Sequence, residues 1–526
     1  MLIICFYFQL VGQQTYEKAY YIENEYSLHL GYFPIFVTQF PNNDYVFGGN
    51  KIITAESNCS FITKVDSSGN PIYSKVIEQP GANNIINTSD GGFLITSTSY
   101  GYLSNKEIIL IKVDEMFDTV WTKSIGSDDI YDNSITKGIL TKEINNNCYL
   151  TVGMSNAFGA GGYDTFIVKT DFGGNIIWTK TIGSDKNEYI RDFIQTDDNG
   201  FIFCGIIDYG LDAGNGIFLT KLDSLGNLKW TRVFNGNKNH NPRKINLTND
   251  NCFIVFSELY SLGSDRDILI FKTDSNGNIL WSNSYGNSLD DFGSDIICLS
   301  NDSYVFTASL QDPVSSEYNI SLIKIDNFGE VLWSKKYGGE FSCQAGRVSR
   351  TNDGGFVIIG NTTRNFGNGN KDYPILIKTD YNGNTNCNNN ISLNMSNYTI
   401  EIGSLEFQIV NEGNSRSLTE CNIENVIMTD SLLCDFTQKI SSNMDDISVS
   451  VYPNPFHYST NIILDTPKTS SYSVDLYNCL GQLVFSITDI EDNSIMLNKG
   501  NLIEGIYILN ISDNTKIVKQ IKIIIK

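Results

Sequence analysis

One phrase recurs seven times in this chain and constrains its fold more than any other feature. A strand-like run ends in Lys-x-Asp, turns, and resumes with an aromatic residue seven positions after the Asp, or with Cys387 in the last copy. The successive aspartates lie 48, 57, 52, 51, 52 and 54 residues apart; they are Asp66, Asp114, Asp171, Asp223, Asp274, Asp326 and Asp380. A period of about 50 residues built from short strands indicates one supersecondary unit that is copied around a ring or along a stack.

Each copy also contains a second turn signal, upstream of its Lys-x-Asp. Examples are TSDGGFLITS (88–97) and TNDGGFVIIG (351–360). Asp-Gly and Asn-Gly pairs between apolar runs favour hairpins, because type I′ turns need positive φ. In the Asp-x-x-Gly turn, the Gly or its substitute stands where a left-handed residue closes a hairpin loop. Each unit therefore holds four strands, and seven such units predict an all-β fold with a seven-bladed β-propeller.

The repeated side chains are predicted to pack the blades rather than to bind a ligand. The Lys two positions before each Asp lies on the same strand face and is expected to stand opposite the aromatic residue across the hairpin. We assign the same structural role to the repeated aspartates and to the five tryptophans, Trp121, Trp178, Trp230, Trp281 and Trp333.

The ends of the repeat region suggest how the ring closes. The segment TYEKAYY (15–21) is similar to the Trp-bearing strands, yet no Lys-x-Asp strand precedes it. The last hairpin loses its aromatic residue and dissolves into NTNCNNN (384–390). We therefore predict that residues 15–21 pair with residues 375–381 and complete the last blade.

Metal and cofactor chemistry finds little support. The segment DSNGN (274–278) begins like a calcium loop but lacks the downstream bidentate Glu. No CxxC occurs, and the three histidines, His29, His240 and His457, have no partner pattern. Quinoprotein dehydrogenases resemble this chain as tryptophan-docked propellers, but their adjacent cysteine pair has no counterpart here. We expect no cofactor, no metal site and no catalytic residue.

The charge of the chain argues against one class of function, and its carboxylates leave another, glycoside chemistry, open. A net charge of −22 excludes a nucleic-acid partner, because no basic stripe is present. Pairs of acids stand in the loops between blades, at Asp128–Asp129, Asp197–Asp198 and Asp290–Asp291. Such carboxylates would serve glycoside chemistry only if they faced each other across a substrate.

The cysteines divide into two groups. The six within the repeats are expected to be buried free thiols: Cys59, Cys148, Cys204, Cys252, Cys298 and Cys343. Cys387, Cys421 and Cys434 lie in the irregular segment and are candidates for disulfides if the protein is exported.

The N-terminal run LIICFYFQLVGQQ resembles the tail of a secretory signal peptide, although a basic start is missing. A first buried strand is the alternative. No stretch has the 18 apolar residues of a membrane helix.

The last 80 residues carry a different pattern. It consists of Tyr452-Pro453-Asn454-Pro455-Phe456, then Tyr477-Asn478 with Leu480-Gly481-Gln482, then Gly505 with Tyr507, and then a basic and apolar tail. This ordered set resembles the type A C-terminal sorting domain of the type IX secretion system of Bacteroidetes; Cys479 is a minor departure from the pattern. The resemblance implies export across the outer membrane, with that secretion machinery as a partner. The apolar alternation between turns predicts a small Ig-like β-sandwich.

Together these patterns predict four segments and one function. The segments are a signal-peptide remnant (1–12), the propeller (13–386), a linker that could hold a small β element (387–444) and the sorting domain (445–526). We predict a secreted or surface-displayed protein, not an enzyme, that binds a glycan or a surface protein through the segments between the Trp strands and the DGG turns. Within those segments, loops 156–164 and 364–373 are the candidates for binding the glycan or surface protein. The alternative is an extracellular polysaccharide hydrolase or lyase with acids at the propeller mouth.

Overall fold

A computed structural model gives the fold, and every element in its described part is a β-strand. It describes residues 15–22, 31–54, 57–77, 81–99, 106–126, 136–145, 147–210, 214–236, 238–260, 266–287, 289–300, 302–338, 342–365, 370–385, 388–391, 393–403, 407–410, 414–417, 423–426, 428–432, 448–452, 456, 458–465, 472–477, 483–490, 494–500, 502, 505–513 and 516–525. The chain divides into two compact units, Met1–Cys434 and Asp435–Lys526. Within the described part, no helix has the length and apolarity that a membrane crossing requires.

The first unit is built from antiparallel sheets in which each repeat supplies four consecutive strands. Four of the five-stranded sheets follow one scheme, with a fifth strand from far along the chain. They are β10 (Thr136–Ile144), β11 (Cys148–Ser155), β12 (Asp164–Asp171), β13 (Ile176–Gly183) and β32 (Gln408–Val410); β14 (Asn187–Gln195), β15 (Phe201–Asp208), β16 (Asn215–Leu222), β17 (Leu228–Asn235) and β31 (Glu401–Gly403); β18 (Asn239–Leu247), β19 (Phe253–Tyr260), β20 (Asp267–Thr273), β21 (Ile279–Gly286) and β30 (Asn394–Asn397); and β22 (Asp291–Cys298), β23 (Tyr304–Gln311), β24 (Tyr318–Ile325), β25 (Val331–Tyr337) and β29 (Asn389–Asn390).

The remaining strands of this unit form two more sheets. One is five-stranded: β6 (Ala82–Asn87), β7 (Phe93–Thr98), β8 (Ile108–Val113), β9 (Thr119–Gly126) and β33 (Asn414–Ser417). The other is ten-stranded: β26 (Cys343–Arg350), β27 (Phe356–Asn365), β28 (Asn370–Thr379), β1 (Tyr16–Ile22), β35 (Met428–Leu432), β2 (Gly31–Gln39), β3 (Tyr45–Thr54), β4 (Ser57–Val65), β5 (Pro71–Ile77) and β34 (Ile423–Val426). Its two halves meet through a single parallel pairing of Gly31 with Asp372.

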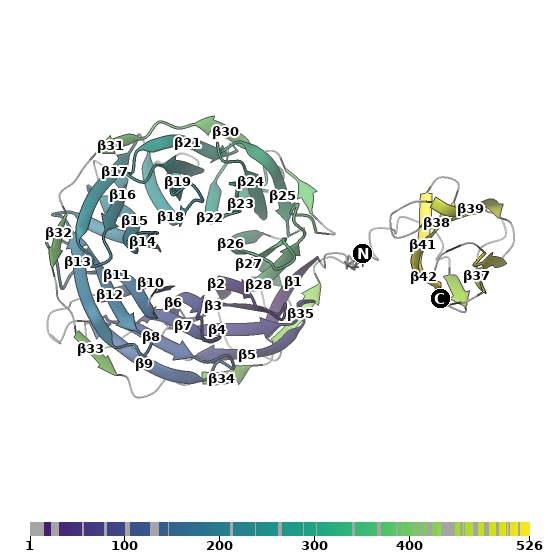
Figure 1. Ribbon diagram of the computed structural model, residues 1–526, viewed down its shortest axis with the longest axis horizontal. Coiled ribbons are helices and arrows are strands. Elements are labelled where there is room, and N and C mark those ends of the chain that lie inside the picture. Colours follow the sequence, from purple (N-terminus) through teal and green to yellow (C-terminus); the bar gives the residue numbers. More distant parts are fainter. Residues whose placement is uncertain are drawn as a thin grey trace, which may run out of the picture. The chain divides into compact units, whose positions relative to one another are not determined.

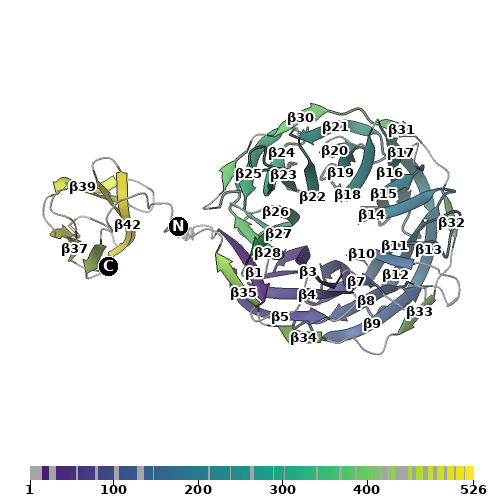
Figure 2. The same cartoon turned by 180° about the vertical axis from the view of Figure 1, so that it is seen from behind.

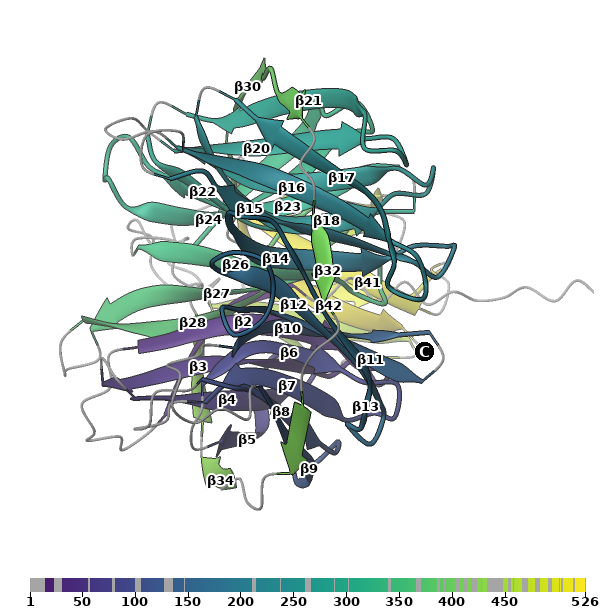
Figure 3. The ribbon, with the colours of Figure 1, turned by 90° about the vertical axis from the view of Figure 1, so that its left-hand side faces the viewer.

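Seen along the axis of the first unit, the sheets stand side by side around a ring (Figure 1). The first strand of each repeat lies innermost, and the Trp-bearing strands lie toward the rim, as the view from behind also shows (Figure 2). From the side, the strands of neighbouring sheets overlie one another (Figure 3). Buried Phe, Ile, Leu and Val side chains fill the space between sheets; one such core cluster joins Leu150 and Ile167 to Phe203 and Phe218 of the next sheet.

The ring closes as the sequence predicts. Strand β1 pairs antiparallel with β28, and Tyr16 stands opposite Lys378. The Glu17 carboxylate accepts hydrogen bonds from Thr385 Oγ1 (2.6 Å) and from the Gly338 backbone N–H (3.2 Å). The N-terminal strand thereby lies between β28 and β35, both of which are more than 300 residues away in sequence.

Residues 389–432 hold seven short strands that run around the outside of the ring. Strands β29 to β35, here called the belt, pair in turn with β25, β21, β17, β13, β9, β5 and β1, so the belt follows the ring backwards. Each belt strand covers an edge that would otherwise be open to pairing with another chain. The sequence predicted a linker here; the structure instead joins these residues to the sheets, so a boundary at residue 386 would divide the sheets.

Both turns of the repeat need a left-handed residue. In the Asp-x-x-Gly turn the positive φ falls on Gly69, Phe117, Gly174, Gly226, Gly277, Gly329 and Gly383, which confirms the predicted hairpin position and its substitute. The turn carboxylate supports it: Asp274 Oδ1 accepts the N–H groups of Asn276 (2.9 Å) and Asn278 (2.8 Å). The aspartate oxygens are therefore used within the turn.

The Trp of one sheet docks on the Asp-x-x-Gly turn of the next. Trp281 Nε1 donates to Asn327 O at 2.9 Å, and a Cβ added to Gly329 would lie 3.0 Å from the Trp281 ring. Trp121 donates to Phe172 O in the same way, at 3.1 Å. This contact explains why Trp and Gly recur together, because only a residue without a side chain lets the indole lie flat on the turn.

The repeated Lys stands opposite the aromatic residue, as predicted: Lys272 pairs in register with Trp281. Its ammonium, however, binds the aspartate of the upstream turn, and Lys272 Nζ lies 2.7 Å from Asp250 Oδ2. The same ion pair joins Lys64 to Asp44, Lys112 to Asp90, Lys221 to Asp198 and Lys378 to Asp353. Burial alone would raise the pKa of Asp198, but hydrogen bonds from Lys221 and Thr196 lower that pKa to about 2. The ion pair therefore ties the two hairpins of one sheet together.

The second unit contains two sheets over one core. Its sheets are β36 (Ser448–Tyr452), β37 (Ser459–Asp465) and β40 (Ser494–Asn498), and β39 (Leu483–Ile490), β38 (Tyr472–Tyr477), β41 (Gly505–Asp513) and β42 (Lys516–Ile525). Ile462 and Leu497 from the first sheet pack with Leu476 and Leu509 from the second.

Candidate functional site

A cavity of about 330 Å³ lies where the innermost strands of all the repeats converge. Strands β2, β6, β10, β14, β18, β22 and β26 all contribute to its wall, so it sits at the centre of the ring; we call it the central cavity. A second cavity of about 370 Å³ shares Ile35, Arg243 and Arg347 with it and reaches Glu258.

A β-bulge in each innermost strand forms this wall. The register shifts between Ile190 and Asp192 in β14 and between Pro242 and Lys244 in β18, which leaves Arg191 and Arg243 as the extra residues. The same shift occurs in the other five strands, at Ile35, Asn83, Ile139, Ser294 and Gly346–Arg347. A bulge re-aims a side chain and locally ends regular pairing. The residues at and beside the bulges are the ones that line the central cavity.

Charged residues gather on one side of this wall. Five cationic side chains and two carboxylates line the cavity: Lys142, Arg191, Arg243, Lys244, Arg347, Asp192 and Asp295. The strands β2 and β6 add only neutral residues, among them Ile35, Asn83 and Asn84.

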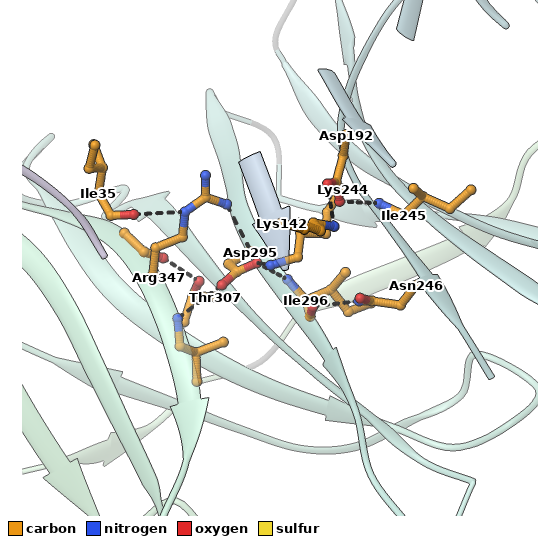
Figure 4. A network of polar contacts seen from close by, with 12 residues as sticks. Ile35, Lys142, Asp192, Lys244, Ile245, Asn246, Asp295, Ile296, Thr307 and Arg347 are labelled. Atoms are coloured by element: carbon orange, nitrogen blue, oxygen red, sulfur yellow. Dashed lines mark hydrogen bonds and ion pairs between the residues drawn. The ribbon is translucent and has the colours of Figure 1, made fainter. Parts of the chain in front are cut away.

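Each carboxylate joins three neighbouring sheets (Figure 4). Asp192 Oδ1 lies 2.6 Å from Lys142 Nζ of the preceding sheet, and its Oδ2 accepts the Ile245 N–H of the following sheet at 3.1 Å. Asp295 repeats this arrangement two sheets further on. It binds Lys244 Nζ at 2.8 Å and accepts the Val348 N–H at 3.1 Å. The two acids thus have a structural part, because they connect adjacent blades around the cavity.

Arg347 and Arg243 each have one acidic partner. Arg347 Nη1 lies 3.6 Å from Asp295 Oδ1, and its Nε donates to Ile35 O at 3.3 Å (Figure 4). Arg243 Nη2 binds both oxygens of the buried Glu258, at 3.1 and 2.9 Å. Arg191 Nε, in contrast, is buried and has no hydrogen-bond partner within the described part of the chain.

Burial, together with the crowding of like charges, lowers the pKa values of two cations in this wall. Burial, followed by the nearby Arg243 guanidinium, lowers the pKa of Arg191. Burial also lowers the pKa of Lys142; Asp192 opposes this shift, while Lys244 and Arg347 add to it. Burial raises the pKa of Asp295. The two cations Lys244 and Arg347 lower it by more, so this pKa lies below its usual range.

Carboxyl groups with raised pKa values occur elsewhere, away from both cavities. Asp164 and Glu188 are fully buried next to each other, and burial raises the pKa of both. Burial likewise raises the pKa of Asp291 to about 7, and its oxygens accept from the backbone and side chain of Asn287. None of the three lines either cavity.

The residues named from the sequence lie mostly away from the central cavity. The repeated aspartates stand at the outer turns and the tryptophans on the strands that follow them. Asp197 lies in the hairpin turn between β14 and β15, within one sheet and not between blades as expected, and Asp290 lies in the loop before β22. In loop 156–164, Phe158 stacks on Phe166 at 5.5 Å and Asp164 is buried. His240 is buried, with Nδ1 3.3 Å from Asn215 O. Of the six repeat cysteines, Cys59, Cys148, Cys204 and Cys343 are buried as expected, whereas Cys252 and Cys298 are only half-buried.

Several predicted residues fall outside the described part. These are residues 1–14, Asp128, Asp129, His29, His457, residues 366–369, Cys387, Cys421, Cys434, Pro453, Asn454, Pro455, Gly481 and Gln482. Of the sorting motif, Tyr452 ends β36, Gly505 begins β41, and Phe456 and Tyr507 are buried in the core of the second unit.

The cationic wall lies in the predicted binding segments, between the Trp strands and the DGG turns, but its individual cations were not among the predicted residues although a signal for them is present. Arg191 and Arg243 each stand five residues before the Thr of the upstream turn, Thr196 and Thr248. Aligning the units on that Thr would have placed the bulge positions side by side. The position varies among the units, however, so a search for what repeats passes over it.

Comparison with known families identifies the C-terminal region. Residues 450–526 match the family model described as a secretion system C-terminal sorting domain. The chain ends in a type IX sorting domain. This confirms the sequence prediction, and such a domain marks proteins that are secreted or held at the cell surface.

Solved structures offer only distant likeness. An ulvan lyase, described as a new family of polysaccharide lyase, is 8% identical with a TM-score of 0.45, over 68% of this chain and 95% of that one. A protein of unknown function from Dyadobacter fermentans is 9% identical with a TM-score of 0.38, over 69% and 99%. PorZ, a surface component of the type IX secretion system of Porphyromonas gingivalis, is 12% identical with a TM-score of 0.35, over 97% and 68%. No curated protein matches the chain.

Proposed function

We propose that this protein is an exported binding protein, whose ligand enters the central cavity of a seven-bladed β-propeller. In this account the ten-stranded sheet is two blades joined at Gly31 and Asp372, which with the five other sheets makes seven. The second unit is proposed to be an Ig-like sandwich that the type IX secretion machinery recognises during export. The belt belongs to the propeller, so the propeller extends to about residue 432.

One observation carries the binding role. The cavity wall is made from a bulge in every innermost strand, and its residues differ from blade to blade, whereas the outer turns are nearly identical. Ligand pockets are concave and present a few polar groups at fixed positions. A wall with a separate residue from each blade meets that description.

The carboxylates of the cavity favour binding over catalysis. A glycoside hydrolase, and a lyase of the predicted kind with acids at the mouth, needs carboxyl groups that are free to reach the substrate. Asp192 and Asp295 are instead each engaged by a lysine and by a backbone N–H. The enzyme alternative therefore rests on acids that already have structural partners.

The test is retention and turnover in the same wells. The full chain is applied to an array of neutral, carboxylated and sulfated polysaccharides and of glycoproteins, and the wells are assayed for new reducing ends and for unsaturated products. Retention without products is the expected result. Release of products would overturn the non-enzymatic role, and retention on none of the surfaces would overturn the binding role.

A further inference from the structure

The central cavity concentrates positive charge in an acidic protein. The chain carries 37 Lys and Arg residues against 59 Asp and Glu. Five of those 37 line a single cavity of about 330 Å³ together with only two acids. Four of these five cations have an acidic partner, yet the cavity wall still carries more cations than acids, against the sign of the whole chain.

The acids that pair with these cations, two in the cavity wall and Glu258 behind Arg243, are hidden while the cations remain accessible. The side chains of Asp192, Asp295 and Glu258 are 5%, 2% and 1% exposed. Their cationic partners Lys142, Lys244, Arg243 and Arg347 are 33%, 23%, 42% and 37% exposed. A ligand in the cavity therefore meets ammonium and guanidinium groups, while the carboxylates stay behind them.

Arg191 has no acid of its own. Its Nε is buried and unpartnered within the described residues, and the adjacent cation is Arg243. Glu258, which binds Arg243, also attracts the Arg191 guanidinium, but the buried Nε of Arg191 is left without an acceptor, which an anion in the cavity would supply. Guanidinium groups also match planar oxyanions, because their N–H donors form a fork with two parallel hydrogen bonds.

We propose that the central cavity binds an oxyanion, a carboxylate, sulfate or phosphate group, which Arg191 and Arg243 hold between β14 and β18. This inference rests on the proposed binding function and gives its ligand a chemical class. The neutral side of the wall, with Ile35 and Asn83, would face the uncharged remainder of the ligand. The cavity is at the small end of the size range of ligand pockets, about 300–1,000 Å³, so it would take one anionic group with little attached.

The choice of probes distinguishes two sources of the anion, a free small molecule and an acidic saccharide. Calorimetric titration of the full chain uses citrate and tripolyphosphate as free anions, oligogalacturonate and a sulfated oligosaccharide as acidic saccharides, and a neutral oligosaccharide as reference. At least one anion is expected to bind more tightly than the neutral probe, with a Kd that rises with ionic strength. Binding of free anions alone would indicate a small-molecule ligand, whereas tighter binding of an acidic saccharide would indicate a glycan; either supports an oxyanion site.

The variants test whether the site is the central cavity. Arg191→Gln is expected to weaken binding about 10-fold or more, because it removes a charged hydrogen bond to the ligand. Arg191→Lys is expected to restore part of the affinity, since it keeps the charge but not the fork. Arg350→Gln is the matched control: Arg350 is exposed three residues after Arg347 on the same strand.

Three outcomes would overturn the inference. They are equal affinity in the wild type and Arg191→Gln, an equal loss in Arg350→Gln, and binding of the neutral probe as tight as that of every anion. Thermal unfolding of each variant shows whether a loss of binding is a loss of fold. If the wild type is retained on the array only by neutral glycans or proteins, the binding function stands and this inference fails.

Discussion

The outer turns and the inner bulges of the repeats differ in what they keep constant. The Asp of the outer turn is present in all seven units, and the aromatic residue that follows it is present in six. The bulge position instead holds Ile35, Asn83, Ile139, Arg191, Arg243, Ser294 and Gly346. The constant residues hold neighbouring sheets together, whereas five of the variable ones line the central cavity and the other two, Ser294 and Gly346, line the second cavity. In this ring, repetition marks stability and variation marks the candidate site.

The largest loss of stability is expected at the outer contact. Trp281→Ala removes the indole that packs on Gly329 and its hydrogen bond to Asn327 O. We expect the free energy of unfolding to fall by about 3 kcal/mol, and we expect anion binding to stay unchanged. All five tryptophans lie in the first unit, so tryptophan fluorescence during urea unfolding follows that unit alone.

The neighbouring substitution Leu280→Ala provides the control. Leu280 is 54% exposed, so its replacement should lower the free energy of unfolding by less than about 0.5 kcal/mol. Equal losses in the two variants would contradict the docking role of the tryptophan.

A smaller loss is expected when the docking glycine gains a side chain. Gly329 has φ +87°, and a Cβ there would also lie 3.0 Å from the Trp281 ring and 2.8 Å from Tyr285 Oη. Gly329→Ala is expected to cost about 2–3 kcal/mol, from backbone strain and overpacking together. Gly354 has φ +84° with no atom within 4 Å of such a Cβ, so Gly354→Ala isolates the backbone cost, about 1 kcal/mol. The comparison by urea unfolding fails if Gly354→Ala costs as much as Gly329→Ala.

Asp291 predicts a pH dependence that belongs to blade structure and not to the cavity. Its pKa in the folded protein is about 7, against about 4 in an unfolded chain. Between these values the folded state holds a proton that the unfolded state has released, so the unfolding free energy should fall as the pH rises from about 4 to about 7. Asp291→Asn should make this fall shallower in urea unfolding at several pH values. An unchanged slope would show that this carboxyl group does not keep its proton in the folded state.

The smallest effect on stability is expected at the cavity. Arg191→Gln removes a charge that lies beside Arg243 and whose Nε has no hydrogen-bond partner in the described residues, so the unfolding free energy should stay the same or rise by less than about 1 kcal/mol. Trp281→Ala is the variant to compare with it. Trp281→Ala should lose stability and keep anion binding, whereas Arg191→Gln should keep stability and lose anion binding. A large loss of stability in Arg191→Gln would instead assign this residue to the scaffold.

The sequence predicted the parts that follow from local rules. The turn chemistry gave the position of the left-handed residues, and the orphaned strand TYEKAYY gave the ring closure through β1 and β28. The ordered motif at the C-terminus gave the sorting domain. The register of Lys opposite Trp also followed from strand periodicity, as at Lys272 and Trp281.

The belt and the cavity could not be predicted in the same way. Each belt strand has two to five residues, too few for a period-2 pattern, and its pairing is determined by edges that exist only once the ring has formed. The cavity depends on bulges, which shift the register by one residue and turn a residue of regular appearance, such as Arg243, toward the axis. Both features are consequences of tertiary structure.

The most direct test of the account is a crystal structure of the full chain grown with the anion that binds most tightly. We predict that its oxyanion lies in the central cavity, within hydrogen-bond distance of Arg191 and Arg243. An anion bound instead on the outer turns or along the belt, with the central cavity filled by water alone, would contradict the division between a repeated scaffold and a variable binding wall.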